Sequence, residues 1–479
     1  MNSKTVFYTV GRVILLEALL LILPLGVSLI YRDGLWRAFT ICILVALAVG
    51  GIMSIVCRKR KSVLSIRDGF AVVSLSWISL SLIGAIPFVI SGEISSYVDA
   101  FFETVSGLTT TGASILTDVE AMSKSLLFWR SFTHWIGGMG ILVFIMAIMG
   151  KAPDRSINIL RAEMPGHTVD KLLPKAKSTA KVLYYIYIAL TVAEAVLLLC
   201  GGMPLFDSVV HALGTAGTGG FGIKADSIGS YSPYLQWVIT VFMLLFGVSF
   251  NLYYLLLLGK WTSARESNEL WTYLGIILAA TIVIGLNIYP VYGSVSEVIR
   301  LSAFQVSALV TTTGYATADF NLWPQLSKAI LLLLMFVGGC MGSTAGGLKI
   351  SRLVILFQSA KNEIRRNFSP RTVSPVRLNG RAVDAREEKA TLSYLALYLV
   401  VIVAVFLLIS FEPFGLETNL SAAISCVNNI GPGFDVVGPA ASYASYSAFS
   451  KIVLSIAMLM GRLEIYPIIS LFYLKTWVK

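Results

Sequence analysis

Charged side chains are scarce in this chain: Asp, Glu, Lys and Arg together make up 13% of its 479 residues. A typical soluble domain carries about 25% charged residues, so the composition argues against a soluble protein. Cysteine is also rare, and no two of the five residues form a CxxC pair; they are Cys42, Cys57, Cys200, Cys340 and Cys426. Most of them fall in apolar stretches, which argues against a disulfide or zinc framework and predicts thiols packed in the core.

Histidine occurs only three times, and the chain contains no H-E-x-x-H or GxSxG pattern. His134 falls in an apolar run, His211 in a short amphipathic segment and His167 in a basic connection, so the three are not expected to converge on a metal. We therefore expect neither an enzyme nor a resident cofactor. A purely structural or receptor protein would not require the repeated motif described below.

Apolar sequence is abundant instead, with 56% hydrophobic residues and a mean hydropathy of +0.79. A helix needs about 20 apolar residues to cross a bilayer. Ten runs approach or exceed this length, near 9–30, 36–57, 69–90, 126–149, 182–201, 233–258, 270–289, 327–357 (interrupted), 391–411 and 452–474. No small-residue cleavage site follows the first run, so we expect it to remain as a span. The pattern predicts an all-α integral membrane protein in contact with lipid.

The positive charge is concentrated in three connections. Of the 37 Lys and Arg residues, 22 lie at 58–67, 151–181 and 349–389. Basic connections face the cytoplasm in membrane proteins, which predicts that both termini are cytoplasmic too. Membrane topology already accounts for this charge, so the net charge of +11 does not indicate nucleic-acid binding.

One glycine motif recurs four times, as TTTGAS around Gly112, GTGGFG around Gly219, TTTGYA around Gly314 and NNIGPGF around Gly431. The intervals between these glycines each leave room for two membrane crossings and a re-entrant piece. Four such segments around one axis would place their carbonyl oxygens at a common mouth, as in a cation filter. A single glycine of this kind would be interpreted as a turn, but four in equivalent positions favour a pore.

A short amphipathic segment precedes each motif and is too short to cross the membrane. The first is Tyr97–Leu108, which predicts a half-membrane helix that stops at the motif. Irregular backbone at that depth must be surrounded by protein or water, so four such segments imply an aqueous axis. An acidic residue also follows each glycine: Asp118, Asp226, Asp319 and Asp435. These residues either concentrate cations at the outer mouth or form turns.

Two further features are predicted to lie below the four glycine motifs. Five glycines between Gly338 and Gly347 disfavour a continuous helix, so the run at 327–357 should break there. Small residues for close helix packing are the alternative, while Leu348 excludes a P-loop because that motif requires lysine at this position. Arg462 sits in the middle of the last apolar run and should face protein or water. Glu464 is only two residues further on, so on a helix it points to another side and is not expected to neutralise Arg462. A buried contact between Arg462 and a Glu residue of another helix is the alternative.

The four glycine motifs, with GGCMGSTAGGLKISR and GRLEIYP, closely resemble the Trk/Ktr/HKT superfamily of potassium uptake proteins over essentially the whole chain. Two extra spans within 9–57 are similar to the TrkH branch rather than the shorter KtrB branch. The resemblance implies four M1–P–M2 units around a pseudo-fourfold pore, with K+ as the transported ion. It also implies a homodimer in the cell inner membrane and a cytosolic TrkA-type nucleotide-binding regulatory subunit.

The resemblance further implies the site residues. The filter would consist of Thr110, Thr111, Gly112, Thr218, Gly219, Thr312, Thr313, Gly314, Asn429, Ile430 and Gly431. The gate would consist of Gly339, Gly342, Ser343, Thr344, Ala345, Gly346, Gly347 and Arg462, with the arginine projecting into the pore to hold the glycine-rich loop and repel an ion. Glycine at position 112 goes with potassium preference in the family, whereas the glycine-rich second segment could loosen selectivity against sodium.

The implied organisation has five parts: two N-terminal spans at 1–66 and four pore repeats at 67–180, 181–268, 269–389 and 390–479. Lys349 and Arg352 follow the glycine-rich loop and are interpreted as residues that either snorkel at the cytoplasmic end or sense the regulator. A sodium-permeable pore or a potassium symporter coupled to Na+ or H+ is the alternative function.

Overall fold

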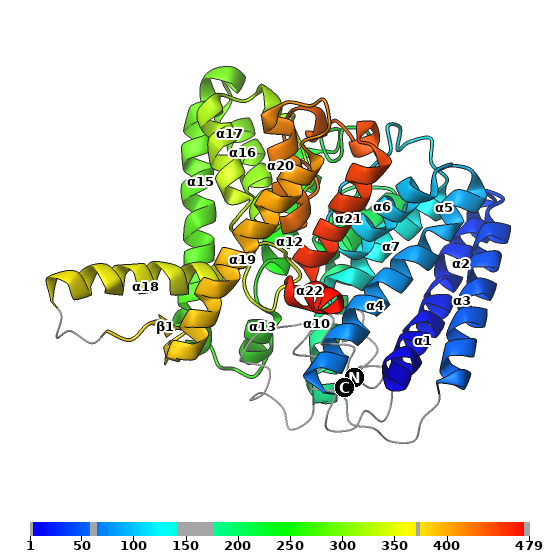
Figure 1. Ribbon diagram of the computed structural model, residues 1–479. Helices are drawn as coiled ribbons and strands as arrows, with labels where there is room; N and C mark the ends of the chain where they lie inside the picture. The colour runs from blue at the N-terminus through cyan, green and yellow to red at the C-terminus, as the bar shows by residue number, and fades with distance from the viewer. Residues whose placement is uncertain (1–2, 58–64, 141–175, 370–373, 474–479) are drawn as a thin grey trace.

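The computed structural model describes residues 3–57, 65–140, 176–369 and 374–473, which are helical apart from loops and one short β-hairpin. The chain begins with three apolar helices at one side of the molecule (Figure 1). They are α1 (Ser3–Leu20), α2 (Ile22–Tyr31) and α3 (Trp36–Val56). α1 packs against α3 and α4, so these helices flank the rest of the bundle.

The remaining helices form four groups. Each group has the same order: a long helix, a short helix, a loop and a second helix. We call these groups units 1 to 4. Unit 1 contains α4 (Ile66–Gly84), α5 (Ile86–Ser91), α6 (Tyr97–Leu108) and α7 (Lys124–Gly138). Unit 2 contains α10 (Ala176–Cys200), α11 (Leu205–Gly217), α12 (Pro233–Phe246), α13 (Phe250–Leu257) and α14 (Thr262–Arg265).

Units 3 and 4 include the short 3-10 helices and the hairpin. Unit 3 contains α15 (Asn268–Tyr292), α16 (Val295–Val310), η2 (Phe320–Leu322), α17 (Gln325–Leu334), α18 (Ile350–Phe368), β1 (Arg377–Leu378) and β2 (Arg381–Ala382). Unit 4 contains α19 (Ala385–Ile409), α20 (Leu416–Asn428), η3 (Asp435–Val437), η4 (Tyr443–Ser445), α21 (Ala448–Arg462) and α22 (Tyr466–Phe472). α18 extends sideways out of the bundle (Figure 1).

The four short helices are α6, α11, α16 and α20, and each has an acidic residue in its first turn. An acidic side chain there complements the positive end of the helix dipole. Each helix ends just before a residue with a left-handed backbone: Thr110, Thr218, Thr312 or Asn429. The predicted half-membrane helix Tyr97–Leu108 has the same bounds as α6.

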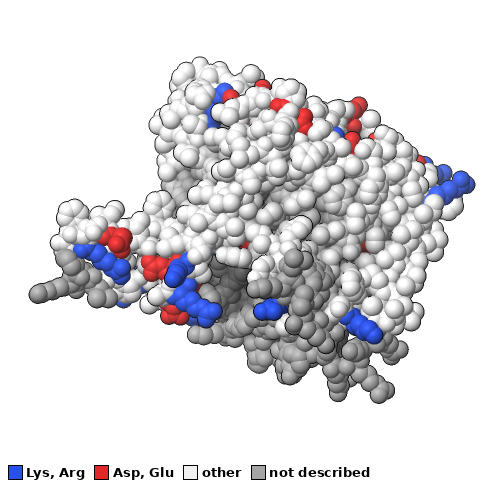
Figure 2. Space-filling view, in the orientation of Figure 1, with Lys and Arg blue, Asp and Glu red and all other residues white. Residues whose placement is uncertain are grey.

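Six of the predicted apolar runs are continuous helices long and apolar enough to cross a membrane, within the part of the chain that the structure describes. They are Ser3–Tyr31, Trp36–Val56, Arg67–Ser91, Lys181–Cys200, Asn268–Tyr292 and Ala385–Ile409. The chain is therefore a multi-pass membrane protein. Figure 2 agrees with this conclusion, because charged side chains lie along the upper and lower edges of the face it shows, with an uncharged band between them.

The second helices of units 2 and 4 are shorter than the sequence predicts. The run 233–258 bends by 88° between α12 and α13, and the run 452–474 breaks between Arg462 and Tyr466, where Glu464 and Ile465 have positive φ. The prediction of continuous spans at these two places is therefore wrong. The break predicted in 327–357 is present between α17 and α18. The second half of the run 126–149, from 141, lies outside the described residues, as do the first basic connection at 58–64 and His167.

Candidate functional site

Four loops meet where the short helices end. In each loop a residue with left-handed backbone is followed two positions later by a glycine with positive φ. The four pairs are Thr110 and Gly112, Thr218 and Gly220, Thr312 and Gly314, and Asn429 and Gly431. Positive φ at the second position is costly for residues with a side chain, which explains why glycine occupies it in all four loops.

These glycines bring the four loops together into a closed ring. A Cβ atom placed on each glycine would lie under 3.0 Å from a carbonyl oxygen of the next loop. The contacts are Gly112 with Gly219, Gly220 with Thr313, Gly314 with Ile430, and Gly431 with Thr111. The order of contacts runs from unit 1 through unit 4 and back to unit 1, so the four loops surround one axis.

The ring corrects the register assumed for the second loop. The residue equivalent to Gly112, Gly314 and Gly431 is Gly220, and Gly219 occupies the position held by Thr111, Thr313 and Ile430 elsewhere. The shared T-x-G spacing, with Thr218 aligned on Thr110, would have given this register from sequence. Gly219 lacks a side chain for a local reason, because a Cβ there would overlap the ring of His134.

One carbonyl in the fourth loop faces the protein. The Gly431 oxygen accepts hydrogen bonds from Ser425 Oγ and Tyr443 Oη, both at 2.8 Å. Burial raises the pKa of Tyr443 well above its ordinary value, so its hydroxyl stays protonated and donates. The Asn429 amide donates to Thr111 Oγ1 at 3.0 Å and to the Met458 carbonyl at 2.9 Å, which joins units 4 and 1.

A cavity of about 330 Å³ opens on one side of the ring and is lined by the glycines Gly112, Gly220, Gly314 and Gly431. Lys224 and Arg130 also line it, whereas no carboxylate among the described residues does. The aspartates accept hydrogen bonds instead: Asp118 from the Glu120 and Ala121 amides, Asp226 from Ser230, Asp319 from the Asn321 amide, and Asp435 from Thr418 of α20. The local contacts of Asp118, Asp226 and Asp319 favour the turn-forming interpretation of these three aspartates.

The loop between α17 and α18, residues 335–349, crosses beneath the ring. The Gly346 amide donates to Thr312 Oγ1 at 2.6 Å, and the Gly347 amide donates to the Asn428 carbonyl at 3.1 Å. On the unit 2 side, the Cys340 amide donates to the Gly247 carbonyl at 2.9 Å. The crossing loop is therefore hydrogen-bonded to units 2, 3 and 4.

Arg462 lies at the C-terminal end of α21, below the ring. Its guanidinium donates to the Thr344 carbonyl of the crossing loop at 2.8 Å. It also donates to the Gly137 and Gly138 carbonyls at the end of α7, at 2.5 and 2.7 Å. Arg462 thus faces protein, as expected, and joins the crossing loop to unit 1.

Two basic residues, one at the end of the crossing loop and one just after it, contact groups inside the protein. Lys349 Nζ donates to the Ala345 carbonyl. Arg352 is buried, pairs with Glu464, and lies over the Tyr394 ring with its Cζ 4.0 Å from the centroid. The inter-helix Arg–Glu contact considered for Arg462 is therefore formed by Arg352.

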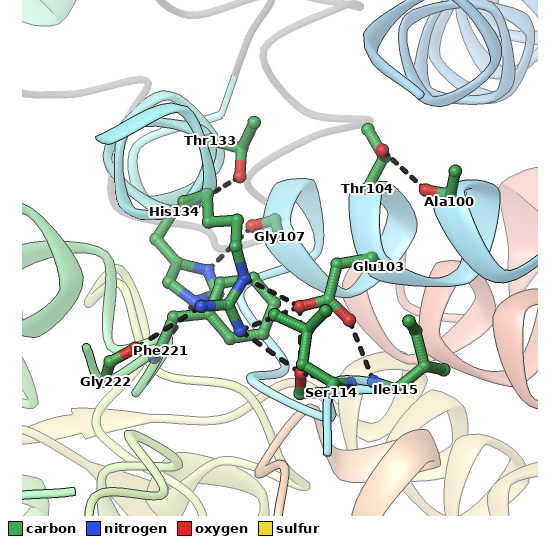
Figure 3. Close-up of polar contacts among 12 residues, drawn as sticks. Ala100, Glu103, Thr104, Gly107, Ser114, Ile115, Thr133, His134, Phe221 and Gly222 are labelled. Atoms are coloured by element: carbon green, nitrogen blue, oxygen red, sulfur yellow. Dashed lines mark hydrogen bonds and ion pairs between the residues drawn. The ribbon is translucent and has the colours of Figure 1, made fainter. Parts of the chain in front are cut away.

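A cluster of polar residues on α6 and α7 lies next to the first two loops of the ring and was not predicted as part of the site. Figure 3 shows Glu103 with Ser114 and Ile115, and His134 next to Phe221. Arg130 donates to the same Glu103 carboxylate. Arg130 and His134 are four residues apart on α7, so both project from the same face of that helix. The available signal was a charged residue in an otherwise apolar run.

The fold and the site together define a polytopic membrane protein in which the loops after four short helices surround one axis, a geometry typical of ion-conducting proteins. Comparison with known proteins gives the family. The chain matches the TrkH family of cation transport proteins over residues 36–476 and belongs to it. This is a family of membrane transporters, which agrees with the expectation that the chain is not an enzyme.

Individual relatives cover the full chain. It is 36% identical to the Trk system potassium uptake protein TrkH of Salmonella typhimurium, with 100% of both chains covered. It is 34% identical to the Trk system potassium uptake protein TrkG of Escherichia coli, with 98% of both covered. The crystal structure of the potassium transporter TrkH from Vibrio parahaemolyticus matches with a TM-score of 0.90, at 31% identity and 100% coverage of both chains.

Proposed function

We propose that this protein takes up potassium across the cell membrane through a channel-like pore. The observation that carries the proposal is the closed ring of four loops, in which each glycine abuts a carbonyl oxygen of the next loop. Carbonyl oxygens can replace the hydration shell of a monovalent cation. The four short helices direct the partial negative charge of their C-terminal ends toward the same place. The similarity to potassium uptake proteins over the full chain identifies the ion.

In this proposal the filter consists of Thr110, Thr111, Gly112, Thr218, Gly219, Gly220, Thr312, Thr313, Gly314, Asn429, Ile430 and Gly431. The gate is the crossing loop with Arg462, because the loop lies under the ring and is joined to it through Thr312 and Asn428. The four units correspond to the repeats at 67–180, 181–268, 269–389 and 390–479, preceded by the spans at 1–66. Gly339, Gly342, Ser343, Thr344, Ala345, Gly346 and Gly347 form the moving part.

The proposal includes the assembly and orientation of the protein. The basic connections place the crossing loop, α18 and both termini toward the cytoplasm of an inner membrane. A TrkA-type nucleotide-binding subunit would act on that side, and two copies of the chain would form a homodimer. The resemblance to the superfamily supports these two partners.

Ion flux tests the function directly. Purified protein in liposomes, with and without its cytosolic partner, is placed under opposing K+ and Na+ gradients and its reversal potential is measured. We expect the potential to follow the K+ gradient. A potential that shifts with both ions in fixed proportion would instead identify a coupled symporter, and one that treats them equally would identify an unselective pore.

The contact between Glu269 and the crossing loop gives a prediction for gating. Glu269 at the start of α15 accepts a hydrogen bond from the Met341 amide at 2.6 Å, and its own amide donates to Asn379 of the hairpin at 3.3 Å. Removing this acceptor in Glu269→Ala leaves the partly buried Met341 amide without its partner, at a cost of about 1 kcal/mol or more. We expect the loop to loosen and K+ flux without the partner to rise about fivefold or more.

Glu269→Gln is the matched control, because its amide oxygen still accepts from Met341. Both variants leave the backbone contact to Asn379 intact. Equal flux from Glu269→Ala and the unmodified protein, at matched reconstitution, would remove Glu269 from the gating mechanism.

A further inference from the structure

The contacts of Glu103 join its own short helix to the first loop of the ring. Glu103 is 1% exposed and lies on α6. One carboxylate oxygen accepts from Ser114 Oγ at 3.0 Å, and the other accepts from the Ile115 amide at 2.9 Å. Ser114 and Ile115 directly follow Gly112 and Ala113. The carboxylate therefore fixes the outer end of the first filter segment.

Arg130 joins the same carboxylate to the second loop. Its Nε donates to Glu103 at 2.7 Å and its guanidinium donates to the Gly222 carbonyl at 3.3 Å (Figure 3). The Arg130 Cζ also lies 4.0 Å from the centroid of the Phe221 ring. Phe221 and Gly222 directly follow Gly220, so one buried side chain contacts corresponding positions of two adjacent filter segments.

His134 adds a second connection from the same helix face. Its Nδ1 lies 2.8 Å from the Gly107 carbonyl of α6, and its Nε2 accepts from the Phe221 amide at 3.3 Å. These two contacts require the neutral ring with its proton on Nδ1. The ring also occupies the space beside Gly219 where a side chain would stand.

Units 2, 3 and 4 lack charged groups at the corresponding positions. The second helices can be aligned on their N-cap residues, Ser123, Ser232, Pro324 and Ser447. Seven residues after the N-cap stand Arg130, Ile239, Leu331 and Leu454, and eleven residues after it stand His134, Met243, Met335 and Met458. The short helices, aligned on their left-handed end residues, place His211, Gln305 and Ala422 where unit 1 has Glu103.

A buried ion pair is a poor source of stability, because an apolar pair of similar volume often replaces it without loss. Three of the four units use apolar residues on the second helix, which shows that packing alone can be satisfied in that way. The pair in unit 1 differs in holding backbone groups of two loops at fixed positions, which apolar residues cannot do.

We propose that the Glu103–Arg130 pair is a positioning device that fixes the spacing of the first two filter segments and thereby sets discrimination between K+ and Na+. The inference rests on the proposed filter function. Neither residue contacts the ion in this proposal; both act through Ser114, Ile115 and Gly222. Loss of the pair would let the carbonyls at Thr111 and Gly219 approach one another and accommodate the smaller ion.

The test compares single and paired substitutions. Glu103→Gln or Arg130→Met alone leaves one buried group without its partner and is expected to impair folding. The double variant E103M/R130M removes both charges together, so it is expected to fold. In liposomes, its ratio of Na+ to K+ permeability should rise about tenfold, a difference of ~1.4 kcal/mol. Thermal unfolding of the detergent-purified protein confirms that the fold is retained.

Two controls separate the possible failures. Glu297→Gln disrupts the partly exposed pair with Arg300 on α16 and should leave the permeability ratio unchanged. Gly112→Ser alters the filter itself. A folded E103M/R130M protein with an unchanged ratio, beside an altered Gly112→Ser, would overturn the positioning role and leave the filter proposal intact. An unchanged ratio in both variants would overturn the filter proposal.

Discussion

Replacing Arg462 with alanine is expected to raise K+ flux in the absence of the cytosolic partner by about tenfold to a hundredfold. The guanidinium is the link between the Thr344 carbonyl of the crossing loop and the Gly137 and Gly138 carbonyls of unit 1. A hydrogen bond to a charged group contributes about 1.5–3 kcal/mol, so losing this link destabilises the closed loop by a similar amount. The proposed gate also loses the positive charge that would oppose an entering cation.

Arg462→Lys separates these two effects. Lysine keeps the charge but is a point donor that cannot reach three carbonyls in a fork arrangement. If the hydrogen bonds hold the loop, the lysine variant should conduct more than the unmodified protein and less than the alanine variant. Flux is measured in liposomes at matched protein content, with and without the partner. Identical flux in all three proteins would show that Arg462 does not hold the gate.

The helices that sequence predicted correctly are those determined by local properties. Long apolar runs such as 36–57 and 270–289 correspond to α3 and α15 because hydropathy and length suffice to define a span. The short helix Tyr97–Leu108 was predictable from its apolar periodicity and from the motif that follows it. Glycine density likewise located the break between α17 and α18.

The breaks that follow α12 and α21 depend on contacts with residues far away in the sequence. A Cβ at Gly247 would meet Thr311 and Tyr273, and a Cβ at Gly461 would overlap the Val427 carbonyl. Each glycine therefore lets the second helix of its unit pack closely against a neighbouring part of the chain. Beyond the glycine, the chain turns away below the ring. Nothing in the local sequence distinguishes these glycines from glycines tolerated inside a straight span.

Sequence motifs located the four loops that meet in the ring, but they did not predict the register of the second loop or the pairing of Arg352 with Glu464. Aligning the motifs on Gly219, the first of the two adjacent glycines in GTGG, shifted the second loop by one residue. The positive φ of Gly220 and its contact with the Thr313 carbonyl show the correct alignment. Arg352 and Glu464 are 112 residues apart, so their pairing depends on how units 3 and 4 pack.

Serine at position 112 is expected to lower the preference for K+ over Na+ by about tenfold or more. Gly112 has φ +80°, a conformation that residues with a side chain adopt only at a cost of about 1–2 kcal/mol. A Cβ there would also overlap the Gly219 carbonyl of the next loop. That oxygen must move away from its place in the ring, where the proposed filter would use it as a ligand for dehydrated K+. Reversal potentials under K+ and Na+ gradients measure the change.

Gly92→Ser is the matched control for backbone strain. Gly92 follows α5 with φ +78°, and a Cβ there would meet no atom within 4 Å. The two substitutions therefore impose similar strain, while only the one at Gly112 displaces a carbonyl of the ring. We expect Gly92→Ser to keep the original permeability ratio. If both variants kept it, the glycine ring would not determine selectivity; if both lost it equally, strain alone would account for the change and the contact between Gly112 and Gly219 would have no specific role.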